Sequence, residues 1–159
     1  MILREVNYSI FILCAVLALV GTISLFPASV AEWRPEWVGL VVAYWVLRAP
    51  QTFGIVTAWV LGLLLDVLRA DILGVNALAM ALVAFLVLSA HQRLQMFPLA
   101  QQSLLIFLFI GLAQMVVHFL QQLLGQHSGG FDYLFPAITS ALIWPLFLLF
   151  WDGVNRKLG

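Results

Sequence analysis

Long apolar runs, separated by short polar or proline-containing connections, dominate the chain. The clearest of them occupy residues 6–26, 52–68, 72–90, 99–123 and 134–151. A helix that crosses a bilayer needs roughly 20 predominantly apolar residues, with a minimum of about 17. Each run is long enough, and Pro27 ends the first because helices rarely continue through proline. The pattern therefore predicts five transmembrane helices.

The segment between Pro35 and Pro50 is apolar but short. A helix over residues 36–49 would rise only about 21 Å, whereas the hydrocarbon core of a bilayer is roughly 30 Å thick. This segment is therefore either a sixth, short transmembrane helix or a re-entrant piece that leaves five spans in total.

Composition excludes a soluble helical domain. Hydrophobic residues make up 64% of the 159 residues and charged residues only 9%, and the mean hydropathy is +1.09. A soluble domain of this size needs far more polar surface. We therefore expect an all-α polytopic membrane protein whose single domain covers residues 1–159. The formal net charge is zero and there is no basic run, so nucleic-acid binding has no support.

The basic residues orient the chain, because cytoplasmic loops of membrane proteins carry an excess of Lys and Arg. With six spans and a cytoplasmic N-terminus, five of the seven basic residues are cytoplasmic, and Arg34 and Arg69 lie outside. With a re-entrant second segment the count is again five against two, but the N-terminus is outside. Both solutions place the C-terminus in the cytoplasm, so charge alone does not fix the number of spans.

Small residues recur at helical spacing in two neighbouring spans. In the span 52–68 the residues four apart are Gly54, Ala58, Gly62 and Asp66. The span 72–90 has a matching face, made of Gly74, Ala77, Ala81 and Ala84. Transmembrane helices associate through close packing and hydrogen bonds, since apolar side chains gain little over lipid. The two spans are therefore predicted to pack with small face against small face.

Asp66 is the one acid well inside an expected span. An ionised carboxylate at the bilayer centre costs about 2.5–3.5 kcal/mol, so it needs a partner. Arg34 is the preferred basic partner, and Arg69 is its competitor. Alternatively, Asp66 caps or hydrogen-bonds a neighbouring backbone, or contacts a partner protein. A proton or substrate pathway is a further alternative, but such pathways usually have several titratable groups in series.

A polar stripe runs along the span 99–123, at steps of three and four residues. It consists of Gly111, Gln114, His118, Gln121 and Gln122. Such a stripe indicates a hydrogen-bonding face between helices, and the alternative is the lining of a cavity for a small polar ligand. The histidines and the lone Cys14 match no metal-ligand spacing. No nucleophile constellation or phosphate loop is present. The sequence therefore predicts neither an enzyme nor a cofactor or metal site.

Two stretches resemble a known family. They are WRPEWVGLVVAYWVLRAP at residues 33–50 and GLLLDVLRADILGVNALAMALVAFLV at residues 62–87. The matching features are Arg34-Pro35, Tyr44-Trp45, Pro50, Gly62, Asp66, Leu73-Gly74, Ala77-Leu78 and Trp144-Pro145. Their order and spacing resemble the rod shape-determining protein MreD family over nearly the whole chain.

This resemblance implies a non-catalytic scaffold in the bacterial inner membrane. Family members work in the cell-elongation machinery (the Rod complex) with MreC, the MreB filament, a SEDS-type glycosyltransferase and a penicillin-binding transpeptidase, which build lateral peptidoglycan. The family is also similar in fold to the vitamin-binding S-components of energy-coupling-factor transporters, which favours six spans. The runner-up function is accordingly a transporter subunit that binds a small, vitamin-like molecule.

The resemblance implies that a set of residues either contacts partner proteins or maintains the structure. The first outer loop is expected to contribute Arg34, Pro35 and Trp37. The body of the protein is expected to contribute Tyr44, Trp45, Gly62, Asp66, Arg69 and Gly74.

Overall fold

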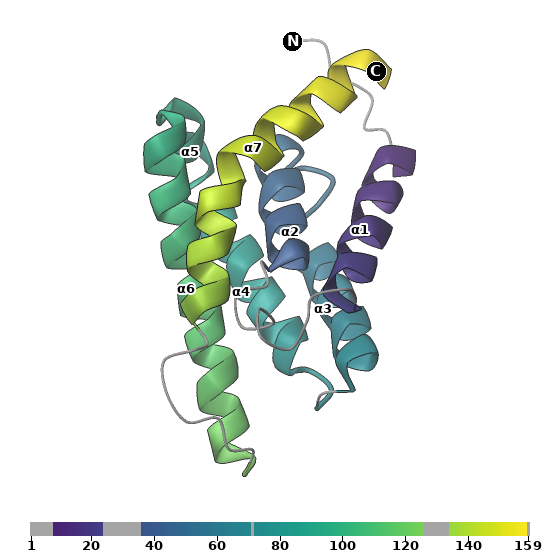
Figure 1. The fold of residues 1–159 in the computed structure, drawn as a ribbon, viewed down its shortest axis with the longest axis vertical. Coiled ribbons are helices and arrows are strands. Elements are labelled where there is room, and N and C mark those ends of the chain that lie inside the picture. The colour runs from purple at the N-terminus through teal and green to yellow at the C-terminus, as the bar shows by residue number, and fades with distance from the viewer. Residues whose placement is uncertain (1–7, 24–35, 71, 126–133, 159) are drawn as a thin grey trace.

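The computed structural model describes residues 8–23, 36–70, 72–125 and 134–158, and this part of the chain is helical throughout, apart from its short connections (Figure 1). In chain order the helices are α1 (Tyr8–Ile23), α2 (Trp37–Arg48), α3 (Ile55–Arg69), α4 (Val75–Ser89), α5 (His91–Met96), α6 (Leu99–Leu123) and α7 (Phe135–Leu158). The prediction of an all-α protein is confirmed for these residues.

Six of these helices coincide with the six apolar segments of the sequence. The short helix α5 was not predicted, since its sequence HQRLQM is polar and precedes Pro98. Helix α7 continues seven residues beyond the expected end at residue 151, because backbone hydrogen bonding does not stop where an apolar run stops. Pro145 lies inside α7, and the helix changes direction along its length (Figure 1).

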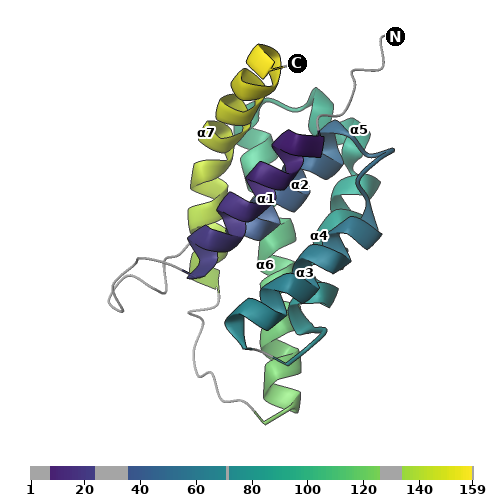
Figure 2. The ribbon, with the colours of Figure 1, turned by 90° about the vertical axis from the view of Figure 1, so that its right-hand side faces the viewer.

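Helix α2 lies at the centre of the bundle, and every residue from Val38 to Leu47 is buried. It packs against α1, α4 and α7, and also touches α3. Figure 2 shows α1 lying across it. Its 12 residues rise about 18 Å, less than the thickness of a hydrocarbon core. Because protein surrounds the helix, it does not have to match the lipid in length.

The helices around α2 present large apolar side chains outward. Val56, Leu104 and Leu142, from three different helices, are all largely exposed. By length and composition Leu99–Leu123 and Phe135–Val154 are each able to cross a membrane, and α1, α2 and α4 are shorter apolar helices. Water would penalise so much exposed apolar surface, whereas lipid does not. The structure therefore has the surface of a membrane protein.

Candidate functional site

The carboxylate of Asp66 caps the first turn of α4. Its Oδ1 accepts hydrogen bonds from the backbone N of Asn76 at 3.0 Å and from Nδ2 of the same residue at 2.9 Å. Its Oδ2 accepts from the backbone N of Gly74 at 2.9 Å and of Ala77 at 3.4 Å. A helix N-terminus has free N–H groups and a positive dipole end, so it is suited to an anion. Asp66 is fully buried, and these donors replace the water it has lost.

This geometry bears out one of the alternatives for Asp66. The carboxylate hydrogen-bonds a neighbouring backbone, which is one of the alternatives that the sequence left open. Arg69, three residues further along α3, contacts Glu36 and Asn76 instead, so the proposed pairing of Arg69 with Asp66 is wrong. Arg34, the preferred partner, lies outside the described residues, as does Pro35.

Gly62 allows α3 and α4 to approach closely. It lies one turn before Asp66 on the same face of α3. A Cβ at this position would lie 2.6 Å from the carbonyl oxygen of Asn76 and 2.7 Å from the backbone N of Ala77. The predicted packing of the two small faces is therefore confirmed at Gly62. It does not extend to Gly54, where a Cβ would meet no atom within 4 Å.

A second buried acid, Glu36, stands at the start of α2 and connects three other helices. Its Oε2 accepts a hydrogen bond from Nε2 of Gln114 in α6 at 2.8 Å. Its Oε1 lies 3.3 Å from Nη2 of Arg69 in α3. Its backbone N donates to Oγ of Ser140 in α7 at 2.8 Å. Glu36 is only 3% exposed, so these contacts provide the polar surroundings that its charge requires.

Arg69 joins the two buried acids into one network. Besides its contact with Glu36, its Nη1 makes a long hydrogen bond of 3.5 Å to Oδ1 of Asn76, the residue that holds Asp66. We call this set of side chains the Glu36–Asp66 network; it comprises Glu36, Asp66, Arg69, Asn76, Gln114 and Ser140. The network links α2, α3, α4, α6 and α7 at one end of the bundle.

Sequence reasoning found only half of this network. It singled out the acid, the arginine and the glutamine of the polar stripe, but missed Glu36, Asn76 and Ser140. Glu36 is the first residue of the expected segment 36–49, and its position at the end of an apolar run did not indicate that it is buried. Asn76 had a detectable signal, since it is the one side-chain amide of α4. A short hydroxyl such as Ser140 in an apolar helix carries no such signal.

Tyr44 belongs to a different polar contact, near the opposite end of α2. Its side chain is fully buried, and its hydroxyl donates to Oδ1 of Asp152 in α7 at 2.8 Å. The other carboxylate oxygen of Asp152 lies 2.6 Å from Nη2 of Arg48. The guanidinium carbon of Arg48 is 5.9 Å from the centre of the Tyr44 ring. These contacts fix the end of α2 to α7.

The remaining predicted residues, Trp45, Trp37 and Gly74, lie outside both polar sites. Trp45 is buried beside Phe11 and Phe53, with ring centroids 5.6 and 5.4 Å away. Trp37 is the first residue of α2, whereas the sequence placed it in a loop. Gly74 precedes α4 with φ of 100°, a left-handed conformation that favours glycine.

The polar stripe of α6 divides into two parts. Gln114 points inward to Glu36, which agrees with the interpretation of a hydrogen-bonding face between helices. Further along, Nε2 of Gln122 lies 3.1 Å from Nε2 of His118 in the same helix. Among the described residues there is no group of three or more His, Cys, Asp or Glu side chains that could hold a metal ion.

Comparison with known proteins identifies the family. The family model for the rod shape-determining protein MreD matches residues 4–154. The chain belongs to the MreD family. A relative, the rod shape-determining protein MreD of Haemophilus influenzae, is 29% identical over 144 residues, which cover 89% of this chain and 88% of the relative. No solved structure matches the chain.

Membership in the MreD family supports a role in rod shape determination. The matched region contains the whole Glu36–Asp66 network and the contact of Tyr44 with Asp152. Within each of these two sites, buried polar groups from different helices of this MreD-family chain hydrogen-bond to one another.

Proposed function

We propose that this MreD-family protein is a non-catalytic scaffold of the cell-elongation machinery in the bacterial inner membrane. In this proposal it binds MreC directly and works with the SEDS-type glycosyltransferase and the penicillin-binding transpeptidase that build lateral peptidoglycan. Its connection to the MreB filament is direct or passes through these partners.

One observation carries this proposal: both buried acids are bound by groups of neighbouring helices and therefore hold the fold together. Asp66 accepts four hydrogen bonds from the start of α4, and Glu36 is held by groups from α3 and α6. A catalytic acid or a proton relay needs a carboxylate that faces a substrate, water or further titratable groups. Carboxylates that tie helices together instead provide the rigid body that a scaffold requires.

The arrangement of the helices supports six spans, formed by α1, α2, α3, α4, α6 and α7. Helix α1 begins and α7 ends at the same end of the bundle, which agrees with an even number of crossings (Figure 1). The ends of α2 and α7, with Arg48, Arg156 and Lys157, lie at that end too. Because cytoplasmic loops are enriched in Lys and Arg, we assign this end, and both termini, to the cytoplasm. This topology also suits the proposed likeness to transporter S-components.

Replacement of the resident MreD protein in a rod-shaped bacterium tests the proposal. We expect this chain to restore rod shape in cells that lack their own MreD protein and to co-purify with MreC. A chain that reaches the membrane at normal abundance but neither restores rods nor retains MreC would contradict the scaffold role. Specific micromolar binding of a vitamin to the purified chain would instead support a transporter subunit.

A further inference from the structure

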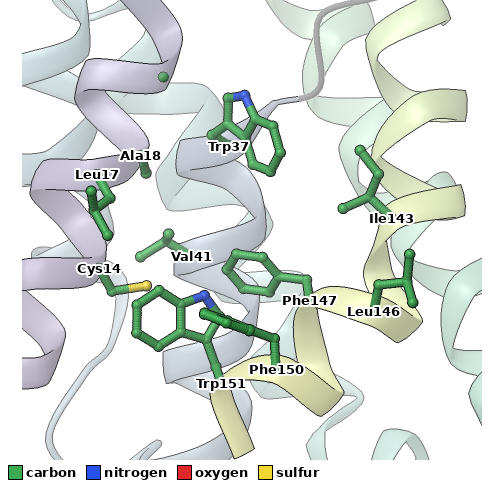
Figure 3. A pocket seen from close by; sticks show the side chains of 11 residues that line it. Cys14, Leu17, Ala18, Trp37, Val41, Ile143, Leu146, Phe147, Phe150 and Trp151 are labelled. Atoms are coloured by element: carbon green, nitrogen blue, oxygen red, sulfur yellow. The ribbon is translucent and has the colours of Figure 1, made fainter. Parts of the chain in front are cut away.

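An apolar groove of about 480 Å³ opens between α1 and α7, with α2 as its floor. Among the residues that line it, α1 contributes Leu17, α2 contributes Trp37 and Val41, and α7 contributes Leu146, Phe150 and Trp151. Figure 3 shows Trp37 at one end of the groove and Trp151 with Phe150 at the other. Leu17, Leu146 and Phe150 are all more than half exposed, so the groove opens to the surroundings of the bundle.

The groove has a basic end. On α7, Lys157 follows the groove-lining Phe150 by seven residues, which places it on the same face two turns further along. On α2, Arg48 follows the groove-lining Val41 by seven residues, so it also lies on the same face of its helix, two turns further along. Both basic residues are exposed. The two helices thus extend from apolar groove walls to basic side chains at one end of the bundle.

Asp152 accounts for part of this charge. It forms the ion pair with Arg48 and accepts the hydrogen bond from Tyr44. Arg156 and Lys157, both exposed in the last turn of α7, therefore supply the excess positive charge at this end of the bundle, and Lys157 is the one on the groove-lining face. An amphiphile with one apolar chain and an anionic head complements both features, the apolar body of the groove and its basic end.

We propose that this groove binds an anionic phospholipid, with one acyl chain between α1 and α7 and its phosphate beside Lys157. The volume agrees with a chain of this kind, since ligand sites of small molecules measure about 300–1,000 Å³. The site is independent of the proposed scaffold role and requires only that the chain is embedded in a membrane.

Native mass spectrometry of the purified chain, titrated with phosphatidylglycerol or with phosphatidylcholine of the same acyl chains, tests the charged end. We expect wild-type protein to retain phosphatidylglycerol in preference to phosphatidylcholine. Lys157→Gln should weaken phosphatidylglycerol binding about fivefold, which corresponds to roughly 1 kcal/mol for one basic residue, and Lys157→Arg should preserve it. Arg93→Gln is the matched control, because Arg93 is an exposed basic residue of α5, which packs on α2 and α4 away from the groove.

A second pair of variants tests the apolar body of the groove. Leu17 lines the groove and is 53% exposed, whereas Leu13, one turn earlier on α1, is 51% exposed and does not line it. We expect Leu17→Trp to weaken the binding of both lipids and Leu13→Trp to leave it unchanged. Equal losses of phosphatidylglycerol binding in Lys157→Gln and Arg93→Gln would mean that the basic surface as a whole attracts the anionic lipid. This result would overturn the proposal. Wild-type lipid retention by Leu17→Trp would also overturn it, and loss of a co-purified protein in that variant would identify the groove as a protein-docking site.

Discussion

Asp66 and Asn76 are joined by two hydrogen bonds to a single carboxylate oxygen, one from the backbone and one from the side-chain amide of Asn76. Asp66 lies in the last turns of α3 and Asn76 in the first turn of α4. The connection between the helices is short, and Ala70 and Gly74 in it both have positive φ. The acid therefore fixes the angle and register at which the chain returns through the bundle.

Loss of this cap should destabilise the fold. Asp66→Ala leaves buried donors of Gly74 and Asn76 without an acceptor, and each such group costs about 1–3 kcal/mol. We expect a loss of about 3 kcal/mol in the free energy of unfolding, and a smaller loss for Asp66→Asn, which keeps one acceptor oxygen. Reversible unfolding in mixed micelles measures both. Wild-type stability of the alanine variant would show that the cap contributes nothing.

Substitution of Gly62 should separate α3 from α4. The Cβ of alanine would lie 2.6 Å from the carbonyl oxygen of Asn76, so one helix must move. We expect Gly62→Ala to lower the free energy of unfolding by about 1–3 kcal/mol, as overpacking of a core does, and Gly62→Leu to disrupt the packing further. Gly54→Ala is the control, with a change within about 0.5 kcal/mol, because no atom lies within 4 Å of a Cβ there. Equal effects at both glycines would contradict the close approach.

A double-mutant cycle on Glu36 and Arg69 measures the contact between them. Glu36→Gln keeps an acceptor for Gln114 but removes the charge that faces Arg69. The side chain of Arg69 is 31% exposed, so solvent screens part of the attraction. We expect a coupling free energy of about 0.5–1 kcal/mol, together with a larger cost for either single variant. Additive effects of the two substitutions would show that the ion pair does not form.

Tyr44 provides a test at the other end of α2. Tyr44→Phe keeps the buried ring but removes the hydroxyl that donates to Asp152. We expect a loss of about 1 kcal/mol in the free energy of unfolding, typical of one hydrogen bond. Tyr8→Phe, at an exposed position of α1, should leave stability unchanged and serves as the control. A stability of Tyr44→Phe equal to that of the control would mean that the hydroxyl is not needed.

Hydropathy and residue spacing predicted much of the fold. The apolar runs located six helices, and the small residues around Gly62 predicted the contact of α3 with α4, because both signals are properties of one helix at a time. The competing alternative, in which Arg69 pairs with Asp66, is wrong, since spacing along α3 favours Asp66 whereas the packing of α2 brings Glu36 closer. Such partners depend on the angles between helices, which the sequence of a single helix does not contain.

The central claim is that this chain is a scaffold that binds MreC. It is tested most directly by measuring how the purified chain binds the membrane anchor of MreC, with both proteins in lipid nanodiscs. A scaffold predicts saturable binding that is retained by Tyr8→Phe and lost together with the fold in Gly62→Leu. Absence of binding by folded wild-type protein would contradict the assignment of this chain as an MreC-binding scaffold.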